Sequence, residues 1–158
     1  MAKLDTATDL IRYQDDYHAW ALQQAALVKA GRFADLDGKN LAAQLKGLAM
    51  SEEREIESRL TVLLQHLLEW EFQPDGRTKS WRASILEQRN RINRVIRRSP
   101  SLRRHPDTVI DEEYRVARLR ASDETGLALG RFPSVRPYSA ADVLDEQFWP
   151  GEAYDFEE

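Results

Sequence analysis

The chain contains no cysteine, which excludes disulfide frameworks, thiolate metal sites and cysteine nucleophiles. Glycine and proline are scarce, with seven and six residues, so long stretches of the chain are free to form helices. No stretch approaches the roughly eighteen consecutive apolar residues of a membrane span, and the first residues lack the basic and apolar regions of a signal peptide. We therefore expect a cytoplasmic protein that does not span a membrane.

Apolar and charged residues are both abundant, at 42% and 32% of the chain. This balance is typical of a helical protein with solvated outer faces, and 158 residues suffice to bury one core. We expect a single domain over residues 1–158 that ends in an acidic tail, residues 151–158. The net charge is only −4, yet residues 77–104 hold ten Lys or Arg and one acid, while residues 142–158 hold seven acids and no base.

Apolar residues recur at three- and four-residue spacing, which predicts amphipathic helices. The longest predicted helix runs from about Gly38 to Phe72, after Asp37 as its N-cap. Glu52 interrupts its apolar stripe, and Ser51 could cap a new helix. The segment could therefore form one continuous helix or two helices joined near Ser51. The absence of proline favours one. The stripe comprises Leu41, Leu45, Leu48, Ile56, Leu60, Leu63, Leu64 and Leu67.

Four further helices are predicted at about residues 7–30, 78–99, 107–125 and 139–149. The first is expected to be capped by Asp5 or Thr6, to end at Gly31, and to bury the face that carries Leu10 and Tyr17. The sequence shows no internal repeat and no convincing strand. The predicted fold is all-α, an antiparallel bundle of about five helices built around one long central helix.

Several short phrases occur in order over residues 9–150. They are Leu36-Asp37, Asn40-Leu41, Ser58-Arg59-Leu60, His66-Leu67-Leu68-Glu69-Trp70, Ser80-Trp81-Arg82, Ser99-Pro100-Ser101-Leu102, Phe132-Pro133, Pro137-Tyr138 and Leu144-Asp145 with Phe148 and Pro150. By these phrases the chain resembles the bacterial family named domain of unknown function twenty-nine (DUF29). The resemblance implies a helical fold and no particular reaction. The chain departs from the family pattern at Gln44, where an acid is expected, and at Glu69, where a lysine is expected.

Arg59 and His66 are the candidate catalytic residues. They lie seven residues apart on the long helix, close to two turns, so both side chains can share one face. This spacing fits the loose Arg-x6-His pattern of RNA-cleaving enzymes of the HEPN type, in which His moves a proton and Arg steadies a phosphate. The structural alternative is that His66 is a hydrogen-bonded residue at the edge of the core and that Arg59 pairs with Glu55.

Two pairs place a carboxylate and an imidazole one helical turn apart, Asp15 with His18 and His66 with Glu69. This spacing could supply metal ligands, which makes a metal-dependent hydrolase a further alternative. Carboxylates on helices are more often solvated partners of Arg and Lys, and no motif for a cofactor is present. We therefore expect no resident metal and no cofactor.

The Arg-rich segment, residues 77–104, is the candidate contact surface for a protein partner or for RNA. Helical geometry places Arg82 and Arg89 together on one flank of its apolar stripe. Alternatively, these two arginines pair with Asp16, Asp37 or Glu55 inside the protein.

The polar residues lie at the borders of helix faces, and none completes a catalytic set. The leading interpretation is therefore a small non-catalytic binding or regulatory module of open oligomeric state, with RNA cleavage or metal-dependent hydrolysis as the alternatives. The expected recognition residues are Asp16, His18, Asp37, Arg59, His66, Arg82 and Arg89.

Overall fold

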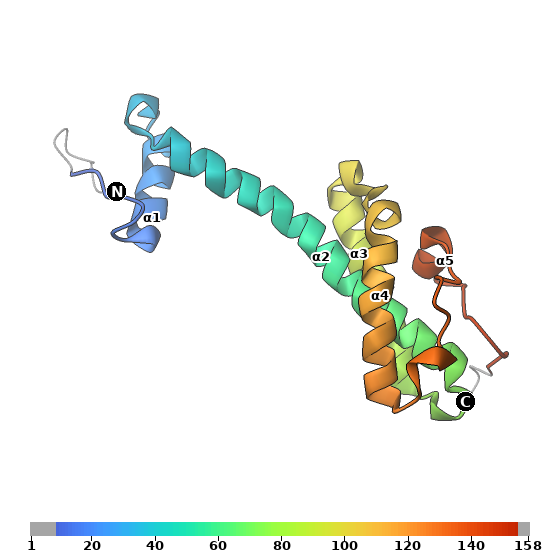
Figure 1. Ribbon diagram of the computed structural model, residues 1–158. Helices are drawn as coiled ribbons and strands as arrows, with labels where there is room; N and C mark the ends of the chain where they lie inside the picture. The colour runs from blue at the N-terminus through green and yellow to red at the C-terminus, as the bar shows by residue number, and fades with distance from the viewer. Residues whose placement is uncertain (1–8, 155–158) are drawn as a thin grey trace. The chain divides into compact units, whose positions relative to one another are not determined.

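Helices account for all regular secondary structure in residues 9–154, the part of the chain that the computed structural model describes (Figure 1). The α-helices are α1 (Tyr17–Lys29), α2 (Gly38–Phe72), α3 (Lys79–Arg98), α4 (His105–Thr125) and α5 (Ala140–Leu144). Four short 3-10 helices connect them, namely η1 (Phe33–Asp35), η2 (Pro74–Gly76), η3 (Pro100–Leu102) and η4 (Leu129–Arg131). The predicted all-α bundle with one long central helix is confirmed. Among the described helices, none has the length and hydrophobicity of a membrane span.

Contacts divide the chain into two compact units, Met1–Ala49 and Met50–Glu158. The single-domain organisation expected from the sequence stays a prediction. Helix α2 is continuous through Ser51, as predicted, because no residue around Glu52 breaks the helical backbone.

The hydrophobic core of the second unit lies between the C-terminal half of α2 and helices α3, α4 and α5. Its apolar residues on α2 and α4 recur at three and four residues, so each helix turns one stripe inward. The fully or almost fully buried core residues on these two helices are Ile56, Leu60, Leu63, Leu64, Leu67, Leu68, Trp70, Ile110, Tyr114, Ala117 and Ala121. Helix α5 contacts both α3 and α4.

Polar contacts between the helices fix their directions. Residues early in α2 contact residues late in α3, which shows that these two helices are antiparallel. Residues early in α2 contact residues early in α4, which shows that these two helices run in the same direction. The contacts are Glu52–Ser99 and Arg59–Gln88 between α2 and α3, and Glu57–His105 and Thr61–Glu113 between α2 and α4.

Helix α1 is shorter than predicted. It begins at Tyr17 because Asp16 has an extended backbone (φ −151°, ψ 94°), and its side chain accepts a hydrogen bond from the amide of Ala19 at 2.9 Å. Residues 9–16 are therefore not helical, and the expected caps Asp5 and Thr6 lie outside the described residues. Gly31 follows the helix with φ +71°, a left-handed conformation that favours glycine, as predicted.

The buried stripe of α2 begins later than its sequence pattern indicates. Ile56 and the apolar positions after it are buried, but Leu45 and Leu48 are each 65% exposed. The expected burial of Leu10 and Tyr17 in the first unit is also wrong, since both are more than half exposed. Periodicity shows which residues share a face but not where a neighbouring element covers that face.

Candidate functional site

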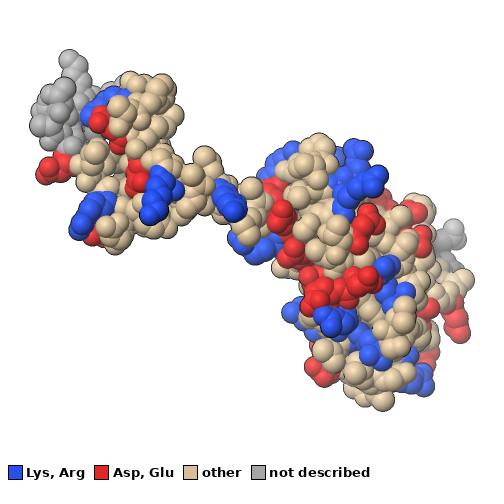
Figure 2. All heavy atoms as spheres, turned by 45° about the horizontal axis from the view of Figure 1, so that its top comes forward, with Lys and Arg blue, Asp and Glu red and all other residues tan. Residues whose placement is uncertain are grey.

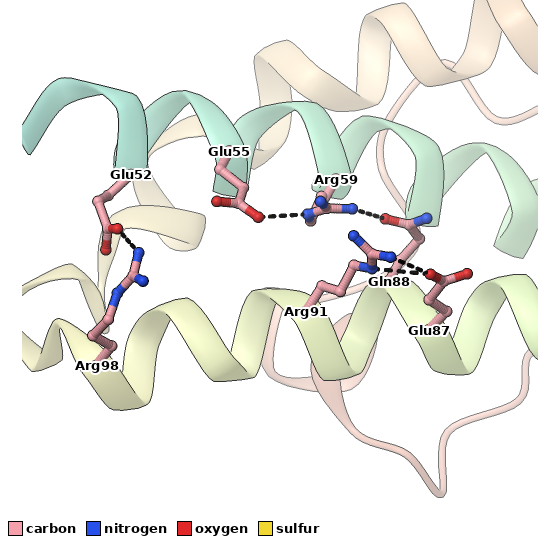
Figure 3. A network of polar contacts seen from close by, with 7 residues as sticks. All are labelled: Glu52, Glu55, Arg59, Glu87, Gln88, Arg91 and Arg98. Carbon is pink, nitrogen blue, oxygen red and sulfur yellow. Dashed lines mark hydrogen bonds and ion pairs between the residues drawn. The ribbon is translucent and has the colours of Figure 1, made fainter. Parts of the chain in front are cut away.

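A network of polar side chains joins α2 and α3 along one side of the second unit (Figure 3). We call it the α2–α3 face. Helical spacing explains its composition, because Glu52, Glu55 and Arg59 recur at three and four residues along α2. The same spacing relates Arg91, Arg94 and Arg98 along α3. The residues of the α2–α3 face are Glu52, Glu55, Arg59, Glu87, Gln88, Arg91, Arg94 and Arg98.

Arg59 bridges the two helices at the centre of this face. Its Nε donates to Glu55 Oε1 at 3.0 Å, and its Nη1 donates to Gln88 Oε1 at 3.3 Å. The pairing of Arg59 with Glu55, one of the two alternatives from the sequence, is confirmed. The Arg59 side chain is 23% exposed, so it is held in place yet still reachable from solvent.

The arginines of α3 are also positioned by glutamates. Arg98 pairs with Glu52 of α2, and Glu52 accepts a second hydrogen bond from the Ser99 hydroxyl at 2.9 Å. Arg91 Nη2 lies 2.7 Å from Glu87 Oε1 one turn earlier. The side chains of Arg91 and Arg98 remain 46% and 68% exposed, so each pair leaves guanidinium donors turned to solvent.

Two shallow hollows open on the α2–α3 face. One, of about 220 Å³, is lined by Glu55, Arg91, Arg94, Val95 and Arg98. The other, of about 230 Å³, is lined by Glu55, Ser58, Arg59, Val62 and Gln88. Three arginines and one glutamate line the first hollow. This arrangement suits carboxylate or phosphate oxygens, which accept paired hydrogen bonds from arginine.

His66 lies beside a buried carboxylate. Its Nδ1 lies 2.9 Å from Oε2 of Glu69, and the Glu69 side chain is completely buried. Glu69 also accepts a hydrogen bond from Gln65 Nε2 at 2.8 Å. Because Arg59 and His66 bond to different glutamates, the structure gives each a structural partner, and their catalytic role stays a prediction.

Arg89 is buried and binds the C-terminal part of the chain through hydrogen bonds. Its side chain is fully buried, Nε donates to the carbonyl oxygen of Val143 at 2.8 Å, and Nη2 donates to that of Phe148 at 2.6 Å. The guanidinium also lies over the ring of Trp149, 5.2 Å from its centroid. Burial lowers the pKa of Arg89 to about 10, and the negative charges of Asp145 and Glu146 oppose this shift.

The expected pairing of Arg89 with Asp16, Asp37 or Glu55 is therefore wrong. Backbone carbonyls of Val143 and Phe148 accept hydrogen bonds from its Nε and Nη2 instead, whereas its buried Nη1 has no hydrogen-bond partner among the described residues. Arg82, expected on the same flank of α3, is half-buried.

In the first unit, two of the expected recognition residues support helix termini. Asp16 caps α1, and Asp37 precedes α2 and accepts hydrogen bonds from the backbone amide of Asn40 at 3.2 Å and from its side-chain amide at 2.8 Å. Asp37 also accepts from the indole of Trp20 at 3.1 Å. The hydrogen bond from the Asn40 side chain is the main cause that lowers the pKa of Asp37.

The candidate metal ligands do not form a ligand cluster. Asp15 pairs with Arg12, with Oδ2 at 2.6 Å from Nε, and His18 is exposed on α1. Within residues 9–154, no group of three or more His, Asp or Glu side chains could hold a metal ion.

Sequence reasoning did not identify Gln44 as a structural residue. Its side-chain amide donates to the Tyr13 hydroxyl at 3.0 Å, and its oxygen accepts from the Tyr17 hydroxyl at 2.7 Å. Gln44 is also one of the two positions where the sequence was expected to depart from the family pattern, and the other, Glu69, is a buried partner of His66. Both positions are therefore hydrogen-bonded, and the expected departure from the family pattern was the sequence signal that could have identified them.

The model of the family described as domain of unknown function DUF29 matches residues 12–149. The chain belongs to this family. No curated protein and no solved structure matches it. The DUF29 match covers all five α-helices and the whole α2–α3 face. Because the family description assigns no reaction, any functional conclusion rests on the chemistry of the residues.

Proposed function

We propose that this DUF29 protein is a non-catalytic binding module whose α2–α3 face binds an acidic segment of a partner protein. The observation that carries the proposal is the hollow of about 220 Å³ surrounded by Arg91, Arg94 and Arg98. Two of these arginines are held by glutamates and still exposed, so they are oriented before a ligand arrives. Orientation of the side chains in advance reduces the entropy cost of binding.

Arg94 is the central residue of this proposal. It lies between Arg91 and Arg98 on α3 and is exposed. Among the described residues, none forms a hydrogen bond or an ion pair with its guanidinium. A carboxylate in the hollow could therefore accept hydrogen bonds from Arg94 without breaking an internal pair.

The distribution of charge favours a protein segment over RNA. Glu52, Glu55 and Glu87 alternate with the arginines on this face, and Figure 2 shows acidic and basic side chains intermixed over the second unit. A continuous row of phosphates would meet these carboxylates, whereas a protein segment can place single carboxylates beside single arginines. Val62 and Val95 add apolar lining to the hollows, which suits the aliphatic side chains of such a segment.

A binding experiment with defined probes tests the proposal. Fluorescence anisotropy would compare a labelled peptide of mixed Glu, Asp and Leu residues with a single-stranded RNA of equal net charge. We expect the peptide to bind more tightly, and Arg94→Glu to weaken its binding by about tenfold or more, since a lost charge-assisted contact costs about 1.5–3 kcal/mol. Arg120→Glu, at an exposed position on α4, is the matched control and should change little.

Tighter binding of the RNA, or an affinity for the peptide that Arg94→Glu does not change, would contradict the proposal. The enzyme alternative is tested in parallel by incubating the protein and its His66→Ala variant with total RNA. We expect no cleavage; cleavage that disappears in the variant would replace the binding module by a nuclease that uses Arg59 and His66. The cytoplasmic location remains a prediction from the cysteine-free composition.

A further inference from the structure

Glu55 lines both hollows of the α2–α3 face. Its side chain is 39% exposed, and its Oε1 accepts the hydrogen bond from Arg59 Nε at 3.0 Å. Among the described residues, none donates a hydrogen bond to its Oε2. Figure 3 shows one oxygen of Glu55 directed at Arg59 and the other turned away from it. Glu55 therefore has one acceptor oxygen available to a bound ligand.

The other two glutamates of the face do not offer such an oxygen to the hollows. Glu52 uses both of its oxygens, one for Arg98 and one for the Ser99 hydroxyl. Glu87 pairs with Arg91, and it is not among the residues that line either hollow. Glu55 is thus the acid that a ligand in the hollows would meet.

The balance of charge on the face suits a single carboxylate. The α2–α3 face contains four arginines and three glutamates, so it has one formal positive charge in excess. One ligand carboxylate beside Arg94 neutralises this excess. A second carboxylate would find no uncompensated cation and would lie near the negative charge of Glu55, which repels it.

The free oxygen of Glu55 also determines what should accompany that carboxylate. An ionised carboxylate can only accept hydrogen bonds, so its partner must be an N–H or O–H group. A ligand that covers Glu55 without such a donor removes water from Oε2 and gives nothing in return. A ligand that brings a donor, such as an asparagine amide or a serine hydroxyl, replaces the lost water.

We propose that Glu55 is the specificity-determining residue of the α2–α3 face, and that it selects partner segments in which an isolated carboxylate lies beside a hydrogen-bond donor. The carboxylate binds the arginines of the first hollow, and the donor binds Glu55 Oε2. Segments with contiguous acids are disfavoured despite their greater local charge, because Glu55 repels the second acid. The inference rests on the proposed function, since it defines which acidic segments this face binds.

Two peptides of identical composition test the selection. Both contain four glutamates with asparagine, serine and leucine, so their net charges are equal. In one peptide the glutamates are separated by the other residues, and in the other peptide they are contiguous. By fluorescence anisotropy, we expect the wild type to bind the separated peptide at least about fivefold more tightly, since like charges in contact disfavour the wrong partner.

Glu55→Gln tests whether this residue causes the preference. The variant removes the charge but retains an amide oxygen that can accept from Arg59. We expect the preference to fall to about twofold or less, mainly because the contiguous peptide binds more tightly. Glu87→Gln is the matched control, because it removes the same charge from the face at a position outside both hollows. It should change both affinities by a similar factor and leave their ratio unchanged.

Equal binding of the two peptides by the wild type would overturn the inference and leave the proposed function intact. A preference that survives Glu55→Gln, or that Glu87→Gln also abolishes, would overturn it as well. If neither peptide binds, both the proposed function and this inference are wrong. Glu55→Asp, which retains the charge, should keep the preference. Its loss there, in a variant whose far-UV circular dichroism is unchanged, would show that side-chain length and not charge determines the selection.

Discussion

Tyr138 shows how one buried hydroxyl makes the stability of the protein depend on pH. It is almost fully buried and donates a hydrogen bond to Glu71. Burial, followed by this hydrogen bond to a carboxylate, raises the pKa of Tyr138 well above its ordinary value of 10.0. The folded protein therefore keeps a proton that the unfolded chain loses near pH 10. The contribution is complete below that pH and decreases as pH rises above it.

We accordingly expect Tyr138→Phe to lower the free energy of unfolding by about 1–2 kcal/mol at pH 7, because Glu71 loses its donor. We also expect the variant to lose less stability than the wild type when pH is raised above about 10. Urea unfolding at a series of pH values measures both effects. Tyr17→Phe, which removes the hydrogen bond to Gln44 from an exposed side chain of the first unit, is the control for the loss of a tyrosine hydroxyl. An unchanged alkaline profile in Tyr138→Phe would show that this hydroxyl does not cause the pH dependence.

At the scale of single elements, the start of α3 illustrates a choice that the sequence left open. Thr78 and Ser80 are both suitable N-caps by residue type, and the structure shows Thr78 Oγ1 accepting from the amide of Trp81 at 3.1 Å. Thr78→Ala should therefore destabilise the protein by about 1 kcal/mol, the usual value for a lost N-cap. Ser80→Ala, inside the helix, should change stability little. Thermal unfolding of the two variants makes the comparison, and equal effects would contradict the assignment of the cap.

Local signals predicted most helix boundaries because caps and stops depend on nearby residues. Gly31 and Thr125 end their helices as expected, and Ser139 caps α5. The predicted end of the last helix near residue 149 was wrong, because α5 ends at Leu144 and Asp145 has an extended backbone. The start of α1 was wrong because Asp5 and Asp16 are equally good caps by residue type. The choice between them depends on whether packing or helical hydrogen bonds stabilise residues 9–16 more. No sequence pattern indicates which of the two is larger.

At the scale of the whole molecule, predictions failed where a partner lies far away in the sequence. The pairing of Arg59 with Glu55 spans one helical turn and was foreseen. The bonds from Arg89 to the carbonyls of Val143 and Phe148 join residues 54 and 59 positions apart. Any backbone carbonyl can accept such a bond, so residue type gives no indication of which one does. The α2–α3 face was thus partly predictable, and the hydrogen bonds from Arg89 to residues 143 and 148 were not.

The single-domain prediction concerns the molecule as a whole and has a direct test. Trp20 is buried in the first unit, while the other three tryptophans belong to the second. If the chain is one domain, Trp20 and the second unit should lose their native environments at the same urea concentration, because α2 contributes to both units. Fluorescence of a variant that keeps only Trp20, compared with far-UV circular dichroism, measures this. An earlier transition of Trp20 would show two separately folding units.

The buried position of Arg89 also constrains the order in which the protein can be completed during synthesis. Helices α2, α3 and α4 leave the ribosome first, and they can begin to pack as they emerge. Until residues 143–148 follow, the guanidinium of Arg89 has neither of the two carbonyls that accept hydrogen bonds from its Nε and Nη2 in the finished protein. A charged group without these bonds opposes burial, so it keeps this side of the nascent core hydrated. The last helix therefore completes the fold by bringing hydrogen-bond acceptors to a core that could not close without them.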